Sequence, residues 1–416
     1  MKTVPMKHSR FAGLRPRALA GLVGLAALLP TACDGTAEEP DLAFTVPADD
    51  AWIERRPIPA IRGPLALVTN NYDDTVSYVD LGLEPPAEVA RIPVGLSPVE
   101  REGPHHLVLE PGGDVVWVGI SNFVPNAGGG PHGAHGTGVA NGYAQAYRVA
   151  DGAELARVRV DRNPGDIRIT PDGKKVLLTH FDLLRITQAS PGAGPDELYS
   201  RLAVIDVATR TREALVPVCP AAHGIAVSSD GERAFIACWD DRVAIVDLKT
   251  AGYPSTTADV LPIPGTIASP ECQPYALTPS RDGETVWVGC FESGELRAID
   301  KSGEMTGRAI DLGGAPMFGE QLGDGRLVIP AQANDGLFFL DSETLEIQDT
   351  VRFDPADCRM PHIVQRSGER LVLVCEGDRV APGSLVLLDL EGELEQVIPL
   401  GRYPDDLAII QDGGAR

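Results

Sequence analysis

Short apolar runs alternate with polar turns along most of the chain, and this pattern is the strongest structural signal in the sequence. Pairs of apolar runs flank a Gly-containing turn in segments such as LVLEPGGDVVWVGI, IRITPDGKKVLLTH and IAVSSDGERAFIAC. Apolar runs joined in this way predict antiparallel β-hairpins. The turns recur at intervals of roughly 40–60 residues, which favours a repeat architecture. They are PGGD at 111–114, PDGK at 171–174, SDGE at 229–232, RDGE at 281–284, GDGR at 323–326 and SGER at 367–370.

A third and a fourth strand are predicted after each hairpin. The third ends in aspartate, as in TVSYVDL and RVAIVDL, and the fourth reads as in ELARVRV or EQVIPL. Four short antiparallel strands repeated around an axis are typical of β-propeller blades. Complete units begin near 104, 165, 223, 274, 316 and 361, whereas residues 64–98 supply only three strands. The run DDLAII at 405–410 can supply the missing inner strand. The sequence therefore predicts an all-β, seven-bladed β-propeller closed by pairing of the C-terminal strand with the first blade.

The first unit also resembles a known repeat family. The stretch LVTNNYDDTVSYVDL, followed by RIPVGLSP, is similar to the bacterial YVTN-type propeller repeat, in which a YVTN-like strand precedes a TVSVID-like strand and a VG-x-x-P turn. The resemblance covers about residues 64–410. It implies the propeller fold, and it gives little about function because the family consists mostly of binding or uncharacterised proteins.

The N-terminal region predicts export. Five basic side chains surround or precede the apolar run ALAGLVGLAALL at 18–29, which is too short for a membrane-spanning helix. The stretch LPTAC ends at Cys33 and resembles a bacterial lipobox, although Pro30 stands where Leu is usual, and cleavage without lipidation is the alternative. We predict a signal peptide at 1–32, lipidation of Cys33, an acidic tether at 33–62, the propeller at 63–410 and a tail at 411–416. This places the protein in the cell envelope, in the periplasm or at the cell surface.

The charge of the chain excludes some partners. The net charge is −23, and removal of residues 1–32 leaves 31 basic against 59 acidic side chains, a net charge of −28. Such an acidic chain does not favour binding to nucleic acid or electrostatic attraction to anionic lipid. We expect a monomer that contacts the membrane through its lipid anchor and binds a protein partner or a small ligand.

The cysteines predict disulfides. Besides Cys33 there are six, which in an oxidising compartment favours bonded pairs. One cysteine of each pair precedes the first strand of a blade and the other ends the second strand, with separations of 19, 18 and 17 residues. The alternative is metal ligation, because two of these cysteines stand four positions before a histidine. The predicted pairs are Cys219–Cys238, Cys272–Cys290 and Cys358–Cys375.

The chemistry-bearing residues gather at one predicted mouth of the channel. The residue at the entrance of the first strand, taken blade by blade, gives a ring of Asp405, His105, Gly165, His223, Tyr275, Met317 and His362. The next position and the end of the second strand add Asp406, His106, Asp166 and His180. A long insertion at 121–142 adds His132 and His135, and a second insertion at 181–201 lies on the same face. All seven histidines outside the signal peptide therefore map to one face.

Two functions follow from this mouth. The first is a non-enzymatic scaffold that binds a ligand or partner there, with loop-rich insertions marking the binding side. The second is a metal or redox-cofactor site, for copper if Met317 takes part, using His105, His106, His132, His135, His223 and His362, and the protein is then an oxidoreductase candidate. The propeller of nitrous oxide reductase resembles this plan, although here no separate copper domain follows. Histidines that only hydrogen-bond to nearby carbonyls are the alternative.

The spacing of the ring limits the metal hypothesis. By analogy with wide barrels, we expect the histidines of different blades to stand roughly ten ångströms or more apart. A mononuclear site would then need the loop bearing His132 and His135 to fold inward. Motifs for covalent haem c, serine hydrolases and zinc proteases are absent from the sequence, so no enzyme class is predicted.

Overall fold

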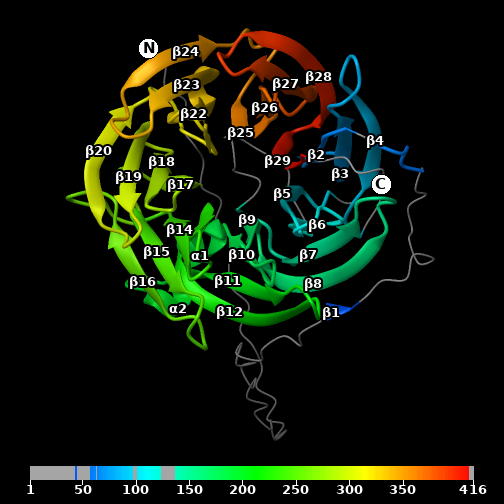
Figure 1. Ribbon diagram of the computed structural model, residues 1–416. Helices are drawn as coiled ribbons and strands as arrows, with labels where there is room; N and C mark the ends of the chain where they lie inside the picture. The colour runs from blue at the N-terminus through cyan, green and yellow to red at the C-terminus, as the bar shows by residue number, and fades with distance from the viewer. Residues whose placement is uncertain (1–42, 45–56, 62, 97–100, 123–135, 412–416) are drawn as a thin grey trace, which may run out of the picture. The chain divides into compact units, whose positions relative to one another are not determined.

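Seven antiparallel β-sheets are arranged in a ring in the computed structural model of this protein (Figure 1). The structure describes residues 43–44, 57–61, 63–96, 101–122 and 136–411, within a unit that runs from Asp41 to Arg416. The predicted signal peptide, Cys33 and the histidines at 132 and 135 lie outside the described residues. None of the helices in the described ranges combines the length and the apolar character needed to cross a membrane.

The strands of each blade follow one another from the centre outward. Blade 1 holds β29 (Pro404–Ile410), β2 (Leu65–Asn70), β3 (Thr75–Asp80) and β4 (Ala87–Pro93). Blade 2 holds β5 (Pro104–Leu109), β6 (Val115–Ile120), β7 (Asn141–Arg148) and β8 (Glu154–Arg162). Blade 3 holds β9 (Pro164–Ile169), β10 (Lys175–His180), β11 (Tyr199–Asp206) and β12 (Thr211–Pro220). Blade 4 holds β13 (Ile225–Val227), β14 (Arg233–Cys238), β15 (Arg242–Asp247) and β16 (Ser255–Asp259).

The remaining three blades have the same plan. Blade 5 holds β17 (Pro274–Pro279), β18 (Thr285–Cys290), β19 (Glu295–Asp300) and β20 (Met305–Asp311). Blade 6 holds β21 (Glu320–Gln321), β22 (Arg326–Ala331), β23 (Gly336–Asp341) and β24 (Ile347–Arg352). Blade 7 holds β25 (Pro361–Ser367), β26 (Arg370–Cys375), β27 (Pro382–Asp389) and β28 (Leu394–Arg402). Helices α1 (Leu183–Gln188) and α2 (Pro195–Leu198) lie in the blade 3 insertion, and a 3-10 turn η2 (Gln332–Asn334) follows β22.

The two ends of the propeller sequence close the ring. Strand β29 is antiparallel to β2, with Leu67 opposite Ala408 and Leu65 opposite Ile410. The predicted seven blades and their closure by DDLAII are therefore confirmed. Closure leaves neither the first nor the last blade with an unpaired inner edge.

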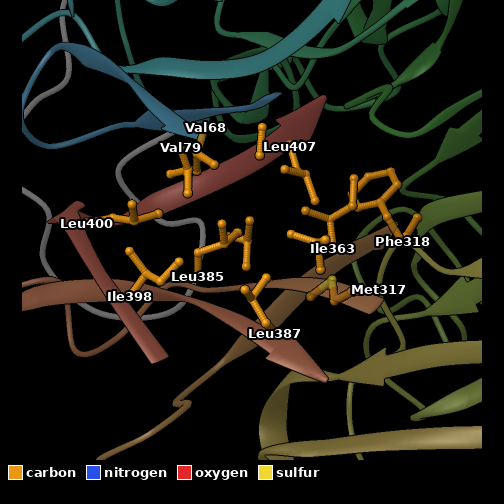
Figure 2. Close-up of a cluster of buried hydrophobic side chains, with 14 of the residues drawn as sticks. Val68, Val79, Met317, Phe318, Ile363, Leu385, Leu387, Ile398, Leu400 and Leu407 are labelled. Atoms are coloured by element: carbon orange, nitrogen blue, oxygen red, sulfur yellow. The ribbon is translucent and has the colours of Figure 1, made fainter. Parts of the chain in front are cut away.

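Apolar side chains pack between neighbouring blades and hold them together. One cluster joins blades 7 and 1, where Val68, Leu385 and Leu407 are almost fully buried (Figure 2). Burying one such side chain contributes about 1.5–3 kcal/mol. The alternating runs of the sequence supply these contacts, because every second side chain of a strand faces an adjacent blade.

Three disulfides join the segment that precedes the inner strand of blades 4, 5 and 7 to the end of the second strand. Cys219 belongs to β12, the outer strand of blade 3, so its bond also links blade 3 to blade 4. The pairs are Cys219–Cys238, Cys272–Cys290 and Cys358–Cys375, with Cα atoms 5.8, 4.6 and 5.2 Å apart. The predicted pairing is confirmed, and the alternative in which cysteines bind a metal is wrong. Each bond closes a loop at the end of the blade where the histidines lie.

The fold differs from the sequence prediction at its edges. The outer strand β16 was not predicted, because its sequence STTAD has no apolar alternation. Within the predicted tether, β1 (Ala43–Phe44) adds a fifth strand to blade 2 by pairing with β8. Ile61, also assigned to the tether, is buried in a core cluster with Leu65. The part of the chain that packs on the propeller therefore begins before residue 63.

Candidate metal centre

The inner strands begin in a way that turns selected side chains toward the channel. In five blades a residue with left-handed backbone, with φ of 53–61°, precedes the proline that starts the inner strand. A register shift follows at once. In blade 2, Pro104 pairs with Ile120 and Leu107 pairs with Val118, so the two histidines between them face a single partner residue. A β-bulge of this kind re-aims side chains, which is how adjacent His105 and His106 both face the channel.

The same irregularity recurs where the other candidate residues stand. In blades 1 and 3 it encloses the pairs 405–406 and 165–166. In blades 5 and 7 it leaves one extra residue, Tyr275 or His362. Five positions of the predicted ring therefore lie in bulges, where strand alternation alone does not give the direction of a side chain.

Four imidazoles meet at the centre of this mouth, and all four are fully buried. Nε2 of His105 lies 3.1 Å from Nε2 of His223. The ring of His106 is 4.3 Å from that of His105, 5.4 Å from that of His223 and 5.8 Å from that of His362, measured between centroids. The imidazoles thus come together without the loop that bears His132 and His135, which a mononuclear site was expected from the sequence to need.

Each of the four histidines uses Nδ1 to contact an oxygen atom. Nδ1 of His105 contacts the carboxylate of Asp405. Nδ1 of His106 is 3.1 Å from Asp406 Oδ2 and 3.2 Å from Asp166 Oδ1. Nδ1 of His223 is 3.3 Å from the carbonyl oxygen of Tyr275, and Nδ1 of His362 donates to the carbonyl of Asp405 at 2.5 Å. With Nδ1 directed to oxygen, Nε2 of His105 and Nε2 of His223 face each other.

Histidines that bind metals show this polarity. Their second nitrogen usually donates to a carboxylate or a backbone carbonyl, which fixes the ring orientation and the tautomer. Nε2 of His106 is buried and has no hydrogen-bond partner among the described residues. A buried polar atom without a partner is costly, so this one indicates a missing ligand. The histidine groupings His105–His106–His223 and His106–His362–Asp405 each place one donor atom per residue within 4.8 Å of the others.

The carboxylates set the charge of the cluster. Burial disfavours the charged form of His106, but Asp406 and Asp166 outweigh it and raise the pKa of His106 to about 10. Burial likewise opposes ionisation of Asp406, yet the charge of His106 and its hydrogen bond lower the pKa of that carboxyl to about 2. The two residues therefore form an ion pair when no metal is bound, and a metal ion would replace the proton on His106.

The carboxyl group of Asp405, which precedes Asp406 in the chain, has a pKa shifted in the opposite direction. Burial, with a contribution from Glu376, raises the pKa of Asp405 well above its usual range. Its Oδ1 lies 3.2 Å from Nδ1 of His362, while Oδ2 contacts His105. Asp405 thus connects two imidazoles from blades 2 and 7 and orients both of them.

A buried network around Glu376 was not predicted. Its Oε1 is 4.0 Å from Nδ1 of His362, and its Oε2 accepts a 2.7 Å hydrogen bond from Arg379. The guanidinium of Arg379 lies 4.2 Å from the centroid of the Tyr403 ring, and Gln332 donates to Glu376. The available signal was position, because Glu376 directly follows Cys375 at the end of a second strand. In a chain with 59 acidic residues that signal is weak.

His180 is buried but is absent from the histidine groupings found among the described residues. Its Nε2 accepts a 3.0 Å hydrogen bond from the backbone N–H of Asp161, and its Nδ1 donates to the carbonyl of Arg201. Burial lowers its pKa to about 4, despite the nearby carboxylate of Asp161. Both nitrogens are thus used in hydrogen bonds to the backbone of blades 2 and 3, which fits a structural role.

Two further ring residues surround the imidazoles. Tyr275 stacks on His223, with centroids 3.7 Å apart and an interplanar angle of 20°. Met317 is buried in the apolar cluster near Ile363 and Leu387 (Figure 2). The histidine and aspartate groupings found among the described residues supply nitrogen and oxygen donors. The role of His132 and His135 stays a prediction, since both lie outside the described residues.

Comparison with known proteins identifies the architecture. No protein-family model matches the chain, and no curated protein matches it. Among solved structures, the periplasmic gluconolactonase PpgL of Pseudomonas aeruginosa is similar, with a TM-score of 0.59, 15% identity, and coverage of 83% of this chain and 99% of that one. A 6-phosphogluconolactonase-like protein of Bacteroides uniformis has a TM-score of 0.58, 14% identity, and coverage of 84% and 100%. Dihydro-heme d1 dehydrogenase NirN has a TM-score of 0.51, 15% identity, and coverage of 88% and 79%. At these identities the likeness shows a shared fold, the seven-bladed β-propeller.

Proposed function

We propose that this protein is an exported, non-enzymatic metal-binding propeller that holds one divalent transition-metal ion among His105, His106, His223 and His362. The observation that carries the proposal is the polarity of these imidazoles. All four direct Nδ1 to an oxygen. One donor atom from each of His105, His106 and His223 lies within 4.8 Å of the other two, and the same holds for His106, His362 and Asp405.

The donor geometry supports zinc as the best match. Zinc binds imidazole nitrogen at about 2.0–2.1 Å in a tetrahedron, so neighbouring nitrogens stand about 3.3–3.4 Å apart. The separation of 3.1 Å between His105 and His223 is close to that value. A blue-copper site would also need a cysteine thiolate, and the six described cysteines are in disulfides. We therefore propose zinc before copper.

The burial of the site favours binding over catalysis. Catalytic zinc sites keep one position open to water or substrate. The imidazoles here are fully buried, which suits retention of an ion and not turnover of a substrate. The three disulfides are consistent with an extracytoplasmic location. Membership of the YVTN repeat family, lipidation at Cys33 and a monomeric state complete the proposal.

Metal analysis tests this function. Protein isolated from the export compartment without chelator should carry about one zinc per chain. The double variant His105→Gln/His223→Gln should lose that ion and should keep the far-ultraviolet circular dichroism of the blades. His180→Gln is the matched control, since it changes a buried histidine outside the cluster. Protein that neither carries nor takes up any transition metal, or equal loss in the control, would contradict the proposal.

A partner that docks on the loop-rich face is a second candidate function. Val139, Ile263 and Val380 are 68%, 83% and 81% exposed. They lie in the β6–β7, β16–β17 and β26–β27 connections, which open on the same face as the histidines. Such a partner could receive the ion. In-cell crosslinking through a photoreactive residue at position 263 should give a specific product, which Val380→Asp should weaken; crosslinks no different from those at exposed Leu394 would contradict it.

A further inference from the structure

A second site is built into the opposite end of the channel. A cavity of about 340 Å³ opens among the inner strands, where their far halves approach the Asp-Gly turns. Its wall is mostly apolar, with Leu107, Leu277, Phe318, Ile363 and Leu407 at its buried base. Figure 2 shows three of these side chains, from blades 6, 7 and 1, next to one another. Cavities of this size and composition, with a few polar groups, are typical of small-molecule sites.

Arg168 supplies the polar group at the base of the cavity. Its guanidinium is 5.5 Å from the centroid of the Phe318 ring, and its side chain is 25% exposed. Nη1 lies 2.8 Å from Asp166 Oδ1 and donates to the carbonyl of Ile167 at 3.0 Å. Both of these contacts use one nitrogen, so the guanidinium can still offer Nε and Nη2 to an anion in the cavity.

Two more guanidiniums stand beside the rim. Nη1 of Arg281 and Nη1 of Arg366 both lie 4.0 Å from the point where a Cβ on Gly323 would be. Glu320, on the wall of the cavity, is the acidic residue nearest to them that the lining contains.

Carboxylates also stand beside these arginines. Asp166 and Asp406 lie 2.8 and 3.8 Å from Nη1 of Arg168. Glu369 lies 3.0 Å from Nη2 of Arg366. Attraction of an anion to this cavity therefore depends on Arg168 and the lining of the cavity, and not on an excess of positive charge.

We propose that this cavity binds a small organic anion with an apolar body, such as a medium-chain carboxylate. The carboxylate lies against Arg168 at the base, where a guanidinium offers charge-assisted hydrogen bonds. The apolar body lies along Leu109, Leu277 and Ile409 and is removed from water. The base of the cavity adjoins the metal centre, because Asp166 contacts both Arg168 and His106. The proposal of an anion site does not depend on the proposed metal-binding function.

Calorimetry with two matched probes tests the site. Octanoate carries the charge and the chain, whereas 1-octanol carries the same chain without the charge. The metal-free full-length protein should bind octanoate with one-to-one stoichiometry, and it should bind octanol about tenfold or more weakly, because the charged hydrogen bond is lost. Arg168→Met should weaken octanoate by a similar factor and leave octanol unchanged.

A second pair of variants keeps the test decisive if Arg168→Met does not fold. Leu109→Trp fills the cavity without changing any charge and should abolish binding of octanoate. Leu394→Trp, on exposed β28, adds the same indole outside the cavity and should leave binding unchanged. The proposal is wrong if octanoate does not bind at millimolar concentration, if octanol binds equally well, or if Leu109→Trp binds octanoate like the unmodified protein.

Discussion

Nε2 of His105 lies 3.1 Å from Nε2 of His223, although the two residues are 118 positions apart and belong to blades 2 and 4. Blade 3 stands between them, and its residue at the same ring position is Gly165. A Cβ at Gly165 would be 2.9 Å from Thr179 Oγ1 and 3.4 Å from His223 Cδ2. The missing side chain of blade 3 therefore gives the two imidazoles room to meet.

Gly165→Ala should for this reason weaken zinc binding. The added methyl group pushes on Thr179, whose hydroxyl donates to the carbonyl of His223 at 2.6 Å, and on the His223 ring itself. We expect a loss of about tenfold or more in zinc affinity, because metal sites tolerate little displacement of a ligand. Competition with a zinc chelator measures it. Gly112→Ala at an exposed turn is the control, and an affinity equal to that of the control would contradict the packing argument.

Asp406→Asn should weaken zinc binding by about 10–100-fold, the usual effect of losing a carboxylate that supports a ligating histidine. The amide keeps the shape of Asp406 but removes the charge that orients His106 at 3.1 Å. Asp196→Asn, at an exposed position of α2, is the matched control. The same chelator competition gives the result. If both variants bind zinc like the unmodified protein, Asp406 does not act through His106.

The sequence predicted the blades because each carries the same local signals. The SDGE turn is one example: Gly231 adopts a left-handed φ of 70°, which a tight strand–strand turn requires. The cysteine pairs were also predictable. In each pair one cysteine precedes an inner strand and the other ends the second strand, and these two positions are neighbours in an antiparallel blade. Strand β16 was missed because its residues are polar and exposed, so its pairing with β15 leaves no pattern in the sequence.

The site was predictable as a ring of residues but not as a geometry. The entrance of each inner strand identified His105, His223 and His362, but the bulges that direct His105 and His362 depend on three-dimensional pairing. Position alone also grouped His180 with them, although both nitrogens of its ring hydrogen-bond to the backbone of blades 2 and 3. Glu376 is the opposite case, a site residue that was not identified from the sequence. A single buried glutamate cannot be distinguished from exposed ones in an acidic chain.

Removal of the Cys219–Cys238 disulfide should lower both stability and zinc affinity. The bond closes a loop of 19 residues, so alanine at both positions should cost about 3 kcal/mol in free energy of unfolding. His223 stands four residues after Cys219, so its backbone should also become less fixed. Denaturant unfolding and chelator competition measure the two effects. Ile310→Ala, on the outer strand β20, gives a destabilised control whose zinc affinity should not fall; an equal fall in both variants would show that stability alone accounts for it.

Glu320 should make the protein less stable as the pH rises toward neutrality. Burial raises the pKa of this carboxyl from 4.5 to about 7, although Arg281 and Arg366 act in the opposite direction. Between these values the folded protein holds a proton that the unfolded chain has lost, so the free energy of unfolding falls as pH increases. The effect is absent below about pH 4.5 and complete above about pH 7. Glu320→Gln removes the titrating group and should raise stability at pH 8 by about 1–3 kcal/mol. It should change little at pH 4.

Urea unfolding at pH 4, 6 and 8 checks this prediction. Glu369→Gln is the control, because that side chain is exposed in the neighbouring blade. The difference between Glu320→Gln and the unmodified protein should grow with pH, while that for the control should stay flat. A constant difference would mean that the carboxyl at 320 ionises as easily in the folded protein as in the unfolded chain. In that case the wall of the proposed anion-binding cavity, which Glu320 lines together with Phe318 and Ile363, is more accessible to water than the burial of those two side chains indicates.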